Sequence, residues 1–362
     1  MNTSTLLGVE FRPIAIPESI HSSDASDFIS MVEVRNRVYR EIRGSDDNSV
    51  SAAELLPLYQ RDSYELRCLW LVVLDGRPVG RVGVDLPLEK GSKAAYWLVE
   101  LLTEVHGQGL GTAGHALVEQ TARAHSRTVL QSWAEHPAAP GPVVLSPTGF
   151  GSIPEDRAAL FYEANGYTLE QVERVSGLDL RASTERLEEL LTAARTAASG
   201  YRVVQWSPPT PDEFVEGYAW MKSRMSTDAP AAGLEFDEET WDAARLARHD
   251  STYTDGGRLM LVTAAQHIES GALCAFNELV IGPDRTAASH QEDTLVLKEH
   301  RGHRLGMLVK CIGLLTWREL VPESPRITTY NAEENRPMLD INEAIGFAPI
   351  AYEGAWKKVL DD

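Results

Sequence analysis

Two short glycine-rich segments contain the residue types that bind an anion. The first is HGQGLG at residues 106–111, and the second is RGHRLG at residues 301–306. Each one precedes an amphipathic stretch that is typical of a helix. Glycines at a strand-to-helix junction let successive backbone N–H groups point at one anion, at the positive end of the helix. Each segment therefore predicts a pyrophosphate site, and a glycine turn with only a structural role is the alternative.

The two segments differ at their middle glycine, where Arg304 stands in place of Gly109. A side chain there predicts a turn without positive φ, because that conformation favours glycine. The guanidinium can instead bind a pyrophosphate directly. Together with His300, Arg301 and His303, it forms the densest basic cluster of the chain. An anion site and a solvated start of a helix are both compatible with this cluster.

Residues 109–114 also read GxGxxG, the dinucleotide-binding pattern of the Rossmann fold, in which Glu135 would bind the ribose. That fold places the pattern after the first strand of an open parallel sheet. Here residues 68–87 predict a strand, an Asp-Gly turn and a second strand, and residues 93–102 predict a third. The Rossmann interpretation is therefore disfavoured, and the second segment lacks its pattern.

The elements around the two segments recur in the same order, which indicates one α/β unit used twice. In each half, three predicted strands precede the glycine segment. A helix, a strand, a short helix and a last strand follow it. The short helices end at Gly166 and Gly346, each followed by an aromatic residue. We therefore expect an N-terminal domain over 1–180, a linker helix over 181–200 and a C-terminal domain over 201–362.

The first copy is longer than the second, because it carries a proline- and glycine-rich stretch at 135–152. This composition predicts a stiff loop rather than an added element of secondary structure. It is either a surface insertion or a wall over the site of the first copy.

Composition limits the classes of partner. The chain has 34 Lys+Arg against 53 Asp+Glu and a formal net charge of −19, which argues against nucleic acid and anionic membranes. It is 43% hydrophobic and 24% charged, an ordinary globular composition. Cys68, Cys274 and Cys311 have no disulfide or zinc spacing. The start of the chain has no signal-peptide pattern, and the longest apolar run, 68–74, is too short to span a bilayer, so we expect a cytoplasmic protein.

The order of elements and the glycine segments resemble the GNAT superfamily of acyl-CoA-dependent N-acyltransferases. Its pattern at this loop is Q/R-x-x-G-x-G/A. The first copy departs from it at His106, and the second departs at Arg304. The paired layout is similar to that of mycothiol synthases. The resemblance implies two GNAT-like α/β domains, each a mostly antiparallel mixed sheet flanked by helices.

The resemblance also implies roles for individual residues. Backbone amides of the loop would bind the pyrophosphate of coenzyme A, and a tyrosine of the short helix would protonate the leaving thiolate. Tyr162 stands at that position in the first copy, and Asn342, which cannot donate a proton usefully, stands there in the second. The expected contacts to acetyl-CoA are Leu101, Leu102, His106, Gly107, Gln108, Gly109, Leu110, Gly111 and Thr112 in the first copy, and Arg301, Gly302, His303, Arg304, Leu305, Gly306, Asn331 and Asn335 in the second.

The acceptor amine needs a base, because an amine with a pKa of about 10.4 is almost fully protonated at neutral pH. Glu100 and Glu104 lie in the segment that enters the first loop, and Glu292 and Asp293 lie before the second. The spacing does not show which way these side chains point. A solvated charge at the end of a strand is the alternative for each, and Glu100 is the candidate that we select.

We therefore expect transfer of an acyl group, most simply acetyl from acetyl-CoA, to a primary amine of a small molecule by direct attack. The first copy is the expected catalytic one, although in mycothiol synthases the C-terminal copy is active. No metal, nucleic acid or membrane is expected, and the protein is expected to be a monomer or a homodimer. The alternatives are a non-catalytic tandem protein that binds or senses acyl-CoA, and an aminoacyl-tRNA-dependent transferase.

Overall fold

The computed structural model describes residues 8–60, 62–137 and 139–361. The chain forms two compact units, and neither is one continuous stretch of sequence. The N-terminal unit consists of the residues up to Val172 together with 231–237 and 353–362. The C-terminal unit consists of 173–230 and 238–352. Each half of the sequence therefore supplies a part of the other half's unit.

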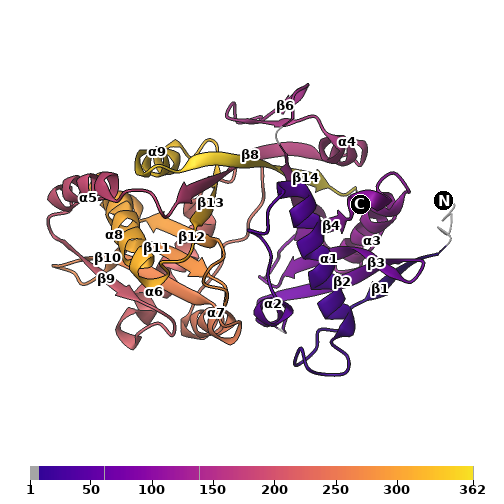
Figure 1. Ribbon diagram of the computed structural model, residues 1–362, viewed down its shortest axis with the longest axis horizontal. Coiled ribbons are helices and arrows are strands. Elements are labelled where there is room, and N and C mark those ends of the chain that lie inside the picture. The colour runs from indigo at the N-terminus through magenta and orange to yellow at the C-terminus, as the bar shows by residue number, and fades with distance from the viewer. Residues whose placement is uncertain (1–7, 61, 138, 362) are drawn as a thin grey trace. The chain divides into compact units, whose positions relative to one another are not determined.

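The N-terminal unit is a mixed sheet with helices on both faces (Figure 1). Its helices are α1 (Ser26–Arg43), α2 (Ala52–Tyr59), α3 (Leu110–Ala124) and α4 (Arg157–Ala164). Its strands are β1 (Val9–Pro13), β2 (Glu65–Leu74), β3 (Arg77–Pro87), β4 (Ala94–Leu101), β5 (Val129–His136), β6 (Val143–Leu145), β7 (Ser152–Pro154), the start of β8 (Thr168–Asp179) and the end of β14 (Ala348–Val359).

The strand order in this unit is β1-β2-β3-β4-β5, followed by β14. Neighbours from β1 to β4 are antiparallel, and β4 pairs with β5 in parallel. The hairpin between β2 and β3 turns at Asp75 and Gly76, both at positive φ, as the Asp-Gly pattern predicts. The three-strand meander before the first glycine segment is therefore confirmed.

Two layers of helices cover the sheet of this unit. On one face, Phe28 and Met31 of α1 pack with Leu55 of α2 against Leu71 of β2. On the other face, α3 approaches closely at Gly114, where a Cβ would lie 3.2 Å from the side chains of Val82 and Val99. The amphipathic pattern after the first glycine segment thus forms a helix that covers β3 and β4.

The C-terminal unit repeats this arrangement. Its helices are α5 (Glu185–Ala197), α6 (Asp212–Asp228), α7 (Ala243–Asp255), α8 (Leu305–Leu320) and α9 (Arg336–Ile345). Its strand order is β8, β13 (Arg326–Ala332), β12 (Ser289–Val296), β11 (Leu273–Ile281), β10 (Leu259–His267) and β9 (Tyr201–Trp206).

Helices also cover both faces of the C-terminal sheet. Phe214 of α6 and Leu246 of α7 pack on one face, in a cluster with Phe276 of β11. On the other face, α5 contributes Leu187 to the cluster that contains Trp317 of α8. The helix between the two halves is therefore part of the core of this unit and not an exposed spacer.

The mixed α/β class expected from the sequence is confirmed. The expectation of a plain loop at 135–152 is wrong, because β6 and β7 pair as a short antiparallel ribbon with Val144 opposite Ile153. The β-branched residues Val143, Val144 and Ile153 are the strand signal that the surrounding prolines and glycines masked. Within the described parts of the chain, no helix has the length and apolar character needed to cross a bilayer.

Candidate functional site

The first glycine segment forms a tight turn into α3. Gly107 has φ +78° and Gly109 has φ +85°, so both positions need the freedom of glycine. No described side chain caps α3, and the first backbone bond back into the turn runs from the Ala113 N–H to the Gly109 carbonyl. The N–H groups of residues 110–112 are therefore free of intrahelical partners and can converge on an anion.

Two residues of α4 lie against this turn. The Phe161 ring is 3.4 Å from the position that a Cβ on Gly111 would occupy, so the ring closes one side of the loop. The guanidinium of Arg157 is 3.8 Å from the corresponding position on Gly107. Arg157 is exposed and makes no ion pair with the described residues, so its charge is available to an anion on the loop. The sequence reasoning missed Arg157, although its place at the first turn of the short helix was a signal.

The edge of β4 that faces β5 is open over its second half. The parallel pairing stops at Tyr96 and Gln131, whereas β4 stays paired with β3 as far as Leu101. The Leu102 N–H donates to the Val79 carbonyl. Because N–H groups alternate between the two edges of a strand, the Leu101 N–H points to the edge that β5 has left. Of Leu101 and Leu102, both expected to contact acetyl-CoA, Leu101 is therefore the one whose backbone N–H can reach a ligand.

Tyr162 spans the point where these strands diverge. The Tyr162 hydroxyl lies 2.7 Å from Ser132 Oγ of β5. The Ser132 hydroxyl in turn donates to the Trp97 carbonyl of β4 at 2.7 Å. Tyr162 is buried, and burial raises its pKa above the usual value. The phenol is thus protonated at neutral pH and lies at the open edge of β4, as a proton donor to a group bound there would.

Glu100 lies near the end of β4, directly opposite Arg81 of β3. Arg81 of β3 holds its carboxylate through two hydrogen bonds, Nε to Oε2 at 2.7 Å and Nη2 to Oε1 at 2.9 Å. Burial alone would raise the pKa of Glu100, but the charge and hydrogen bonds of Arg81 bring it below the usual value. Glu100 is therefore ionised and firmly paired, while Glu104 is half exposed beside Arg77.

Side chains of the first loop lie on its outer surface. His106 Nε2 is 3.1 Å from the Leu101 carbonyl, and Gln108 Nε2 donates to the Glu104 carbonyl at 3.4 Å. Both residues are exposed. Their side chains brace the turn, and the anion would be held by its backbone.

The second glycine segment has the same backbone shape. Gly302 has φ +91° and Arg304 has φ +54°, and α8 begins at the next residue without a side-chain cap from the described residues. The expectation that an arginine excludes positive φ at 304 is wrong. A non-glycine residue in this conformation costs about 1–2 kcal/mol, which the packing of the surrounding strand and helix outweighs.

The basic cluster around this loop contacts Tyr201, the first residue of β9. His300 Nδ1 is 2.8 Å from the Tyr201 hydroxyl, and the Tyr201 ring lies 5.4 Å from the His303 ring. Arg301 Nε donates to the Val296 carbonyl at 3.3 Å. A Cβ on Gly306 would lie 3.0 Å from Ile341 of α9, so α9 covers this loop much as α4 covers the first.

In the C-terminal unit, Asn342 of α9 stands at the position that Tyr162 has in α4. Asn342 accepts a hydrogen bond from Lys310 Nζ at 2.7 Å and donates to Asn331 Oδ1 at 2.7 Å. Lys310 is fully buried, and this burial lowers its pKa to about 7. Asn335 precedes α9, and its side chain makes no cap there within the described residues.

The two carboxylates before the second loop, Glu292 and Asp293, differ in their surroundings. Asp293 Oδ2 accepts from the buried Lys222 Nζ at 2.6 Å, and Glu278 Oε1 lies 3.1 Å from the same nitrogen. Glu292 is exposed. Among the described residues, no group of three or more His, Cys, Asp or Glu side chains could hold a metal ion.

Comparisons with known proteins agree with this arrangement. Residues 31–139 match the acetyltransferase (GNAT) family. A tandem GNAT protein from the clavulanic acid biosynthesis pathway is 24% identical, over 98% of this chain and 99% of that one, with a TM-score of 0.76. A GCN5-related N-acetyltransferase from Sphaerobacter thermophilus is 14% identical, over 98% and 96% of the two chains, with a TM-score of 0.63. No curated protein matches the chain.

The fold of the whole chain is that of tandem GNAT structures. The segment that matches the GNAT acetyltransferase family, residues 31–139, reaches from within α1 to just past β5. The resemblance drawn from the glycine segments is thereby confirmed.

Proposed function

We propose that the protein transfers an acetyl group from acetyl-CoA to a primary amine of a small molecule, and that the N-terminal unit is catalytic. The proposal is supported by three features that occur together in the N-terminal unit. The uncapped glycine turn before α3, the open edge of β4 and the Tyr162 hydroxyl all belong to this unit. They are suited, in that order, to a pyrophosphate, an acyl thioester and a leaving sulfur.

In this proposal, the amides of residues 107–112 and the Arg157 guanidinium hold the pyrophosphate. The Leu101 N–H polarises the thioester oxygen, and the amine attacks the carbonyl carbon directly. A backbone donor fixed before the reaction stabilises the developing oxyanion without reorganisation. Tyr162, whose hydroxyl proton points at Ser132 Oγ in the absence of substrate, turns this proton to the sulfur and donates it as the carbon–sulfur bond breaks.

The acceptor amine must also lose a proton. That Glu100 is the base that accepts this proton remains a prediction. The Glu100 side chain is largely buried and both oxygens hydrogen-bond to Arg81, so in this proposal a proton reaches it through water. The geometry of Glu100 mainly supports a structural role, in which its pair with Arg81 joins β3 and β4 beneath α1.

We propose that the C-terminal unit binds acyl-CoA at residues 301–306 without catalysing transfer. Its loop has the same φ pattern, and Arg304 adds a charge for the pyrophosphate. However, Asn342 cannot supply the proton that Tyr162 supplies. The domain limits 1–180 and 201–362 remain a prediction, to which we add that segments 231–237 and 353–362 belong to the N-terminal unit.

The test is release of coenzyme A thiol from acetyl-CoA in the presence of a panel of primary amines, with mass spectrometry of the products. We expect at least one amine to be acetylated. Tyr162→Phe should lower kcat by about a hundredfold, because general acid catalysis contributes about 10²–10⁴-fold. Tyr330→Phe, a change at an exposed tyrosine of the other unit, is the control. Tight binding of acetyl-CoA with no acetylated amine would replace this proposal by the sensing alternative.

A further inference from the structure

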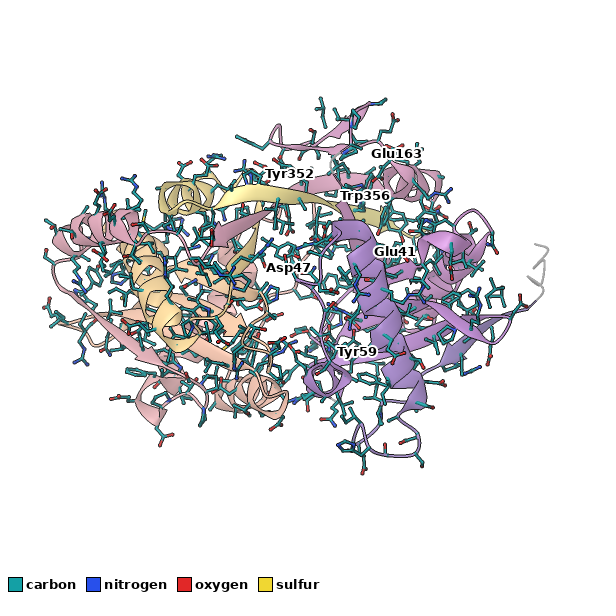
Figure 2. The ribbon with its side chains drawn as sticks, in the orientation of Figure 1. Glu41, Asp47, Tyr59, Glu163, Tyr352 and Trp356 are labelled. Atoms are coloured by element: carbon teal, nitrogen blue, oxygen red, sulfur yellow. The ribbon has the colours of Figure 1, made fainter. Side chains whose placement is uncertain are left out.

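The Tyr162 ring stacks face to face on Trp356. The ring centroids are 4.9 Å apart and the planes differ by 4°. Trp356, labelled in Figure 2, comes from β14 at the far end of the sequence, in the segment 353–362 that belongs to the N-terminal unit. The predicted proton donor of the first copy is therefore held by a residue of the chain's last strand.

The stack holds the phenol in one orientation. Ser132 has a single hydroxyl proton, which goes to the Trp97 carbonyl, so the Tyr162 hydroxyl donates to Ser132 Oγ. Trp97 and Tyr167 pack around the same ring, each with its centroid 5.5 Å away. Trp356 covers one flat side of the ring. Its removal would leave a cavity into which the phenol can move away from the open edge of β4.

Trp356 is itself held rigidly. It is fully buried, and its indole N–H makes no hydrogen bond within the described residues. A Cβ on Gly354 would lie 2.8 Å from the indole nitrogen, so this glycine leaves the space that the indole occupies. The orientation of the indole is therefore set by packing and not by a hydrogen bond.

The strand that carries Trp356 is tied to both helices of the site. Lys358 Nζ donates to Glu119 Oε1 of α3 at 2.6 Å and to the Asn165 carbonyl, at the end of α4, at 2.7 Å. The helix that begins at the glycine loop and the helix that carries Tyr162 are thus joined through this strand. Movement of β14 would change the distance between the proposed pyrophosphate site and the proton donor.

We propose that Trp356 is a positioning residue for proton donation by Tyr162, and that the C-terminal strand is a part of the N-terminal active site. This rests on the proposed function. Trp356 touches neither substrate in this scheme and acts by fixing the phenol beside the leaving sulfur. A chain that ends before β14 would keep the glycine loop and Tyr162 but would lack the surface that orients the phenol.

The test is a double-mutant cycle on the acetylation rate. Trp356→Leu removes the stack, Trp356→Phe keeps a flat ring, and each is made alone and with Tyr162→Phe. We expect Trp356→Leu to lower kcat about tenfold while the KM for acetyl-CoA changes less than twofold. In the Tyr162→Phe background the same change should alter kcat less than twofold, because the donor it positions is already absent. Trp356→Phe should retain most of kcat.

Two further variants make the outcome decisive. Trp317→Leu removes an equally buried indole of the C-terminal unit and should leave kcat unchanged. If Trp356→Leu does not fold, Gly354→Ala displaces the indole through its new Cβ and enters the same cycle. Equal losses in both backgrounds, or no loss, would overturn this inference and leave the proposed function intact. A wild-type protein that acetylates no amine overturns both.

Discussion

Arg81 and Glu100 form a bidentate ion pair in the interior of the N-terminal unit, with N···O distances of 2.7 and 2.9 Å. The side chains are 3% and 16% exposed, so water screens the pair weakly. Arg81 Nη1 also donates to the Tyr59 hydroxyl of α2 at 3.2 Å. The pair therefore links the sheet to the helix layer above it and leaves a buried guanidinium that depends on one carboxylate.

Glu100→Gln is expected to destabilise the N-terminal unit by about 3 kcal/mol, because it leaves the Arg81 charge buried without its counter-ion. The pH dependence of unfolding checks the cause. The folded pKa of Glu100 is lowered, so its stabilisation is complete above the unfolded pKa of about 4.3 and is lost as pH falls through the folded pKa. The variant should lack this acid-dependent loss. A variant with wild-type stability at pH 7 would show that the pair contributes nothing net.

Arg157→Glu is expected to weaken acetyl-CoA binding about tenfold or more. A charge-assisted hydrogen bond to phosphate contributes about 1.5–3 kcal/mol, and a glutamate there also repels the pyrophosphate. Calorimetric titration measures the change. Arg195→Glu, at an exposed position on α5, makes the same charge change elsewhere and should leave the affinity within twofold. Equal affinity in the two variants would remove Arg157 from the site.

Arg304→Gly separates the strain of the second loop from its charge. Glycine adopts φ +54° freely, so the free energy of unfolding of the C-terminal unit should rise by about 1 kcal/mol. Acetyl-CoA binding at that loop should weaken, because the guanidinium is gone. Thermal unfolding with and without acetyl-CoA reports both effects. Lower stability together with unchanged binding would contradict the assignment on both counts.

Lys310→Met is expected to stabilise the protein most at low pH. The folded pKa of about 7 lies below the unfolded value of about 10.4, so burial of the ammonium costs most below pH 7. The cost disappears as pH rises from about 7 to about 10. The difference in unfolding free energy between variant and wild type should therefore shrink across this range. A difference that stays constant with pH would mean that Lys310 does not titrate there.

Sequence reasoning recovered the repeat because the repeat is local. Each glycine segment, each hairpin and each short helix ending at Gly166 or Gly346 has a pattern within a few residues. The φ values at Gly107 and Gly109 and the helices that follow the loops agree with those patterns. The exchanged segments 231–237 and 353–362 have no such pattern, because only tertiary packing decides which core a strand joins.

Non-local partners also explain what was missed at the site. Trp356 lies far from Tyr162 in the sequence, and nothing in its neighbours marks it as a stacking partner. Glu100 was a candidate base because charge at a strand end is visible, whereas its pairing with Arg81 depends on the register of β3 against β4. Arg304 was misjudged because backbone preference was weighed without the packing that fixes the turn.

The most direct test of the central claim is calorimetric titration of acetyl-CoA into the wild-type protein and three variants. Gly109→Glu puts a carboxylate in the first loop, Arg304→Glu does so in the second, and Gly91→Glu is the matched control. Gly91 has φ +87° against +85° at Gly109 and has open space around it, so a glutamate there also meets a positive φ but lies outside the first loop.

The account predicts that Gly109→Glu abolishes binding in the N-terminal unit, while Gly91→Glu leaves it unchanged. Binding lost only in Arg304→Glu would move the catalytic site to the C-terminal unit. No binding by the wild-type protein would contradict acetyl-CoA as the donor.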